Sequence, residues 1–210
     1  MSAGPRGDDS RASLLSEARA AYRARMHLFR TVLIASAALT LSATAFADDL
    51  KKQWTTPPDE LSQLKFFVGS WHCEGTTTPP AAVGKPFANK VNLTYASTLD
   101  GFWIGVTNDG EKVPGQPVPN TGKGEGRLGY DRVAKQFVNL GVSNRGGWSM
   151  GTSKGWEADK LVWSGSASGT IKADFHTTIT KKGDSEFHLV GERQDGTKWV
   201  TSDDVVCKKK

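Results

Sequence analysis

After Trp71 the chain shows no second helical period, and its apolar residues fall in short runs divided by Gly, Asn, Asp and Pro. Several runs alternate apolar with polar residues, as where Val91, Leu93 and Tyr95 are interleaved with Lys, Asn and Thr. Such alternation is typical of strands with one buried face, so we predict about ten strands. The predicted strands are residues 70–76, 89–99, 102–108, 124–131, 135–143, 147–153, 160–167, 170–181, 185–194 and 198–208.

Tight turns separate many of these runs. Asp100-Gly101, Gly183 and Asp195-Gly196 each place a glycine where a hairpin needs a positive φ angle. Runs joined this closely must be antiparallel neighbours, and a long antiparallel series tends to curl shut because closure removes exposed edges. The sequence therefore predicts an all-β fold, a closed antiparallel up-and-down β-barrel.

One short helix is expected before the first strand. Thr56 is a plausible N-cap, prolines follow it, and Leu61, Leu64 and Phe67 have helical spacing. We predict a helix of about two to three turns that leads directly into Gly69-Ser70-Trp71.

The N-terminus has the pattern of an export signal. An uncharged run rich in Ala, Ser and Thr ends in Ala45-Phe46-Ala47, which favours cleavage after Ala47 and a periplasmic or secreted location. The run is too short and too polar for a stable membrane anchor. We interpret Met26 as the true initiator, the alternative being a genuine N-terminal extension. The expected divisions are an extension over 1–25, a signal peptide over 26–47, a flexible leader over 48–56 and the barrel domain over 57–210.

Charge excludes one class of partner. The first 47 residues hold six of the 27 basic and three of the 22 acidic residues, so the mature chain has a net charge of +2. A charge this even does not indicate nucleic-acid binding.

The two cysteines lie in the first and last predicted strands. Those strands are neighbours in an up-and-down barrel, and Cys73 is early in its strand whereas Cys207 is late in its own. In an exported protein this favours a disulfide across the seam, the alternative being two buried thiols.

The histidines give only one pattern with a chemical interpretation. His72 and Cys73 point to opposite faces of a strand, so they do not form a catalytic pair, and no zinc-ligand spacing is present. His176 and His188 lie on consecutive strands of one hairpin. If their polar face lined the barrel, either would be a candidate haem ligand, which is the one cofactor alternative.

No motif establishes an enzyme. Gly165-Ser166 and Gly147-Trp148-Ser149 lack the strand-to-helix context of a nucleophile elbow, and we interpret the glycine-rich residues 122–126 as a turn. No catalytic residue is therefore assigned.

Aromatic residues are spread over the successive strands. A barrel of about ten strands is wide enough to leave room for a small hydrophobic or amphipathic ligand. We predict this ligand class, the other possibility being a filled barrel that serves as a structural or protein-interaction module. The candidate cavity residues are Trp103, Trp148, Trp163, Phe175 and Phe187.

Several motifs together resemble a known family. LKFFVGSW near the first strand, GEGRLGYDRVAKQFV in mid-chain and LVWSG after it are similar to the bacterial calycin-like family of domain of unknown function fifteen seventy-nine. The resemblance implies a barrel related to lipocalins and fatty-acid-binding proteins, with no assigned activity. It also implies that Trp71 plugs the closed end against a basic residue, with Arg193 or Lys198 as the candidates. A more distant similarity to nitrobindin-like barrels implies the haem alternative, with nitrogen oxides or peroxides as substrates.

Overall fold

The computed structural model describes residues 50–117, 121–169 and 171–210, so the expected extension and signal peptide lie outside the described residues. These residues belong to two compact units, divided between Thr55 and Thr56. In the first unit, residues 50–55 form a short helix. The second unit contains every strand described below. No helix in the described ranges is long and apolar enough to cross a bilayer.

The ten predicted strands are all present, and a two-residue strand, β7, is added between the sixth and seventh of them. Boundaries differ from the prediction by a few residues. The strands are β1 (Gly69–Thr77), β2 (Phe87–Thr98), β3 (Trp103–Gly110), β4 (Lys123–Asp131), β5 (Gln136–Ser143), β6 (Trp148–Ser153), β7 (Trp156–Glu157), β8 (Lys160–Ser168), β9 (Ala173–Lys181), β10 (Glu186–Asp195) and β11 (Lys198–Lys209).

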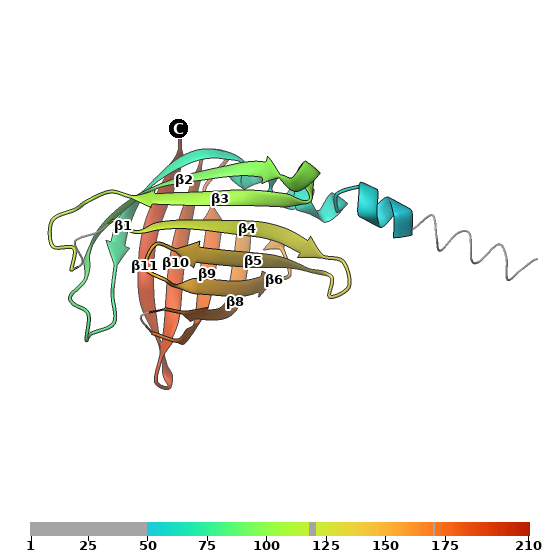
Figure 1. Cartoon of the computed structure of the whole chain (residues 1–210). Helices are drawn as coiled ribbons and strands as arrows, with labels where there is room; N and C mark the ends of the chain where they lie inside the picture. The colour runs from blue at the N-terminus through green and yellow to red at the C-terminus, as the bar shows by residue number, and fades with distance from the viewer. Residues whose placement is uncertain (1–49, 118–120, 170) are drawn as a thin grey trace, which may run out of the picture. The chain divides into compact units, whose positions relative to one another are not determined.

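The strands form one closed antiparallel barrel. Each long strand pairs with its neighbours in sequence, β6 pairs with β8, and β1 pairs with β11 to complete the circle. In Figure 1, β2 to β6 cross in front of β9, β10 and β11, so the two halves of the sheet face each other. The prediction of an all-β, closed up-and-down barrel is confirmed.

A disulfide joins the two strands at the seam. Cys73 of β1 lies directly opposite Cys207 of β11, with the two Cα atoms 3.9 Å apart and the sulfur atoms bonded. Both side chains are fully buried. The disulfide prediction is confirmed, and it agrees with an oxidising compartment.

The helix before β1 is a 3₁₀ helix, η1 (Asp59–Phe67). Its apolar residues Leu61, Leu64 and Phe67 are all buried. They are spaced by three, and at three residues per turn this spacing places them on one face. The expected cap was wrong, because Pro58 occupies the N-cap position and no side chain caps the helix.

η1 and the strand ends next to it close one end of the barrel. Trp71 is completely buried, and its indole Nε1 donates a hydrogen bond of 2.6 Å to the Phe67 carbonyl. Phe187 contacts both rings, with centroid distances of 4.8 Å to Trp71 and 5.7 Å to Phe67. We call this region the closed end.

A lysine lies against Trp71, and it is not one of the two candidates. Lys209 Nζ is 5.3 Å from the Trp71 ring centroid, because Lys209 is the register partner of Trp71. Arg193 is at the far end of β10, where it donates hydrogen bonds to loop carbonyls, and Lys198 begins β11 at the same far end. Gly69 has a φ of 125°, and a Cβ there would lie 2.9 Å from Lys209 Cε. Gly69 therefore makes room for the Lys209 side chain.

Candidate functional site

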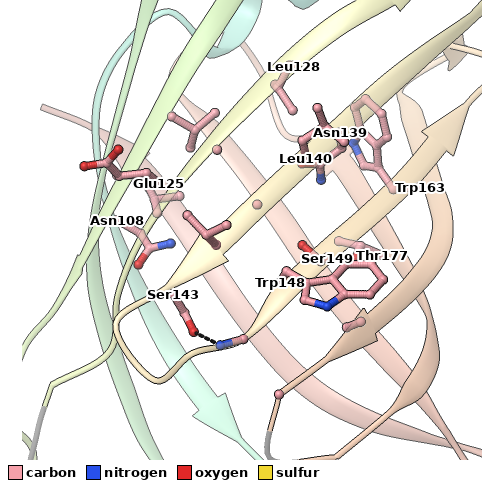
Figure 2. Close-up of a pocket in the computed structure, with 18 of the residues that line it drawn as sticks. Asn108, Glu125, Leu128, Asn139, Leu140, Ser143, Trp148, Ser149, Trp163 and Thr177 are labelled. Atoms are coloured by element: carbon pink, nitrogen blue, oxygen red, sulfur yellow. Dashed lines mark hydrogen bonds between the residues drawn. The ribbon is translucent and has the colours of Figure 1, made fainter.

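The barrel is open at the end opposite η1, and a cavity of about 560 Å³ extends inward from there. Figure 2 shows labelled side chains around it, including Leu128, Asn139, Trp163 and Thr177. These residues belong to β4, β5, β8 and β9, so the cavity is built by strands from both halves of the sheet. Its apolar lining includes Phe67, Leu93, Tyr95, Val106, Leu128, Trp163, Ile179 and Leu189.

The floor of the cavity is the inner surface of the closed end. Phe67 of η1 lines the cavity and stacks on Tyr95, with ring centroids 5.4 Å apart and planes at 29°. Trp163 is only 3% exposed, and it lines the cavity from β8. The fold thus positions an aromatic floor by the same packing that holds η1 in place.

One wall is bare because its inward positions are glycine. Gly126 of β4 is the register partner of Gly141 of β5, and both line the cavity. A Cβ at Gly126 would lie 2.7 Å from the Leu140 carbonyl oxygen, and one at Gly141 would lie 2.9 Å from Ser149 Oγ. The interpretation of residues 122–126 as a turn was wrong, since residues 123–126 lie in β4. Glycines that alternate with polar residues in a strand are the sequence signal for this wall.

Three polar side chains lie inside with no hydrogen-bond partner among the described residues. Tyr95, Asn139 and Thr177 line the cavity, and within the described part of the chain their side chains make no hydrogen bond. No buried side-chain nitrogen or oxygen atom of the described residues lacks a partner. These three groups are therefore reached from the cavity, where water or a ligand can satisfy them.

The structure brings two of the five predicted cavity residues to the lining. Trp163 lies deep in the cavity, and Trp148 lies at its rim with 48% of its surface exposed. Figure 2 labels both, on β8 and β6.

The other three predicted residues have different places. Trp103 covers the outer face of Gly129, where a Cβ would lie 2.5 Å from the indole. Phe187 belongs to the packed closed end. Phe175 packs against the core beside Gly151, whose Cβ would lie 2.9 Å from the ring, and it does not line the cavity.

Neither candidate haem ligand faces the cavity. The His176 ring stacks on Trp199 with centroids 3.9 Å apart, and His188 Nε2 lies 2.7 Å from Asp204 Oδ1. Their neighbours Thr177 and Leu189 line the cavity, so alternation places both histidines on the outer face. The polar face of this hairpin is outside the barrel, contrary to the condition of the haem alternative. In the described ranges no group of three His, Cys, Asp or Glu side chains is arranged to hold a metal ion.

His72 belongs to a charged network on the outside of β1 and β2. Its Nδ1 lies 3.0 Å from Asn92 Oδ1 and its Nε2 3.0 Å from Glu74 Oε1. These hydrogen bonds, that of Asn92 first, raise the pKa of His72. Lys90 Nζ lies 2.8 Å from Glu74, and this contact together with His72 lowers the pKa of Glu74 to about 2.

Comparison with known proteins supports the fold. No protein-family model matches the chain, and no curated protein matches it. The structure is similar to the crystal structure of Rv2717c from M. tuberculosis, with a TM-score of 0.55 and 15% sequence identity. The similarity covers 73% of this chain and 99% of that chain. At this identity the likeness shows the β-barrel fold alone.

Proposed function

We propose that the chain is an exported calycin-like barrel that binds a small hydrophobic or amphipathic molecule without transforming it. The observation that carries the proposal is the cavity of about 560 Å³ at the open end. Ligand pockets commonly measure roughly 300–1,000 Å³ and are mainly apolar with a few convergent polar groups. The aromatic and aliphatic floor, with Tyr95, Asn139 and Thr177 among it, has this character.

The location and the family belong to the same proposal. A disulfide between buried cysteines is compatible with the periplasm or the cell exterior. We propose cleavage of a signal peptide near Ala47 and membership of the calycin-like family that the motifs resemble. A mature chain that begins at Asp48 in the periplasmic fraction is the expected result of N-terminal sequencing.

The open interior favours a ligand carrier over a filled structural module. In a filled barrel the inward positions would carry packed side chains from end to end, whereas here Gly126 and Gly141 leave one wall bare. The placement of His176 and His188 outside the barrel likewise favours the carrier over the haem alternative.

Binding of a neutral apolar probe tests the proposal. Native mass spectrometry after gentle purification, followed by fluorescence titration with a naphthylamine dye, measures adducts, affinity and stoichiometry. We expect saturable binding of one dye per barrel with a dissociation constant in the micromolar range. No adduct and no saturable dye binding would refute the ligand-carrier function.

A further inference from the structure

We propose that the cavity selects an uncharged amphipathic ligand whose polar head exchanges hydrogen bonds with Tyr95, Asn139 and Thr177, and that it discriminates against fatty-acid-like anions. The inference rests on the proposed ligand-binding function and names the chemical class of its ligand. It is carried by the charges around the cavity and by three polar side chains within it that make no hydrogen bond to the described residues.

Charged groups are confined to the exterior of the site. Glu125 and Arg145 are the charged residues that line the cavity in the described part of the chain, and both are exposed. They have opposite signs and both lie near the open end, Glu125 at the start of β4 and Arg145 in the turn after β5. Among the described residues, the apolar floor offers a carboxylate no cation.

A second arginine, Arg193, is on the inward side of β10 and is already engaged. Arg193 lies on the same face of β10 as Leu189, and its guanidinium donates hydrogen bonds of 2.6 Å to the Thr78 carbonyl and 3.0 Å to the Pro79 carbonyl. It does not line the cavity. A carboxylate at the apolar floor of the cavity would therefore be buried without a charge partner among the described residues, which is strongly unfavourable.

The three interior polar groups suit a neutral head. Tyr95 is half-buried, and because it lines the cavity its hydroxyl is accessible from within. Burial raises the pKa of this phenol, so it stays protonated and can donate a hydrogen bond. The Asn139 amide both donates and accepts, as does the Thr177 hydroxyl. A ligand hydroxyl, carbonyl or amide has the matching donors and acceptors, and it costs less to desolvate than an ion.

A matched pair of ligands tests this selectivity. The bound naphthylamine dye is displaced from the intact mature protein by decanol or by decanoate at about pH 8, where the acid is fully ionised. We expect decanol to displace the dye at a concentration about tenfold lower than decanoate does. Equal or stronger displacement by decanoate would overturn the inference while leaving the binding function in place. Failure of the dye to bind would overturn both.

Two variants locate the head group. Tyr95→Phe removes a hydroxyl group and Thr177→Val replaces one with a methyl group, and each is expected to weaken decanol binding roughly 3- to 10-fold, the range of one hydrogen bond. Neither change should alter dye affinity. The controls are Tyr130→Phe, at the closed end beside Phe137, and Thr178→Val, on the outer face of β9. Unchanged decanol affinity in both Tyr95→Phe and Thr177→Val would contradict the assignment.

Discussion

The two ends of this barrel use the same strands for different purposes. At the closed end, Trp71, Phe67 and Phe187 are almost fully buried, and the Cys73–Cys207 disulfide lies among them. At the open end, glycine occupies inward positions of β4 and β5, and polar side chains farther inside line the cavity with no hydrogen-bond partner among the described residues. Stability is therefore expected to depend mainly on the closed end, and ligand affinity on the open end.

Truncation of the end plug should give the largest effect. Trp71→Ala removes the buried indole and its hydrogen bond to the Phe67 carbonyl. We expect the free energy of unfolding to fall by about 4 kcal/mol, as for other buried tryptophans. Urea denaturation followed by circular dichroism measures the loss. A loss below about 1 kcal/mol would contradict the assignment of Trp71 to the stabilising core.

Removal of the disulfide should be the next largest change. The bond closes a sequence separation of 134 residues, so the Cys73→Ala/Cys207→Ala variant gains conformational freedom in the unfolded state. We expect a loss of about 3 kcal/mol in the free energy of unfolding. Addition of dithiothreitol to the native protein should lower its stability similarly. The double variant should be insensitive to dithiothreitol, and a comparable loss in that variant would contradict the explanation.

Substitution of a tryptophan at the open end should affect dye binding more than stability. Trp148 is half-exposed at the cavity rim, so Trp148→Ala is expected to change stability by less than about 0.5 kcal/mol. Loss of its contact should weaken dye binding about fivefold. Trp199→Ala is the matched control, because Trp199 is 41% exposed and lies on the outer face against His176. Equal effects of the two substitutions on dye affinity would contradict the assignment of Trp148, but not Trp199, to the ligand site.

The smallest expected effect is the pH dependence of stability that His72 causes. The raised pKa of His72 means that its protonated form is favoured in the folded state. Its stabilising contribution is fully present below the unfolded pKa of about 6.5 and is lost as pH rises through the higher folded value. Since the site is largely solvated, the expected size is a few tenths of a kcal/mol, roughly that of a surface pair. The free energies of unfolding of the native protein and His72→Gln, measured against pH, should converge above this range. A difference that grows at alkaline pH would contradict the predicted direction of the effect.

The alternation of apolar with polar residues, together with the turn residues, predicted the strands. This worked because the inward-facing positions of a strand recur at every second residue. Barrel order then placed Cys73 beside Cys207, and this pairing did not depend on detailed packing. The same alternation predicted that His72 and Cys73 face opposite sides, as observed. These properties follow from the local sequence and the topology.

The cavity residues were less predictable, because a cavity forms where inward positions carry no side chain that fills the interior. Trp103 is large and apolar, yet its parity on β3 places it outside, over Gly129. Phe187 is inward but lies among the packed side chains of the closed end. The basic partner of Trp71 depended on register: Arg193 is six residues beyond Phe187 on β10, about 20 Å along the strand. Neither depth nor register is specified by residue type alone.

A cavity-blocking substitution tests the central claim most directly. Ala167 lines the cavity from β8, whereas Ser166 beside it lies on the outer face. We predict that Ala167→Trp abolishes binding of the naphthylamine dye while the free energy of unfolding stays within about 1 kcal/mol of the native value. Ser166→Trp should bind the dye as the native protein does. Unchanged dye affinity in folded Ala167→Trp would show that the ligand does not enter the barrel, and would contradict the division of roles between the two ends.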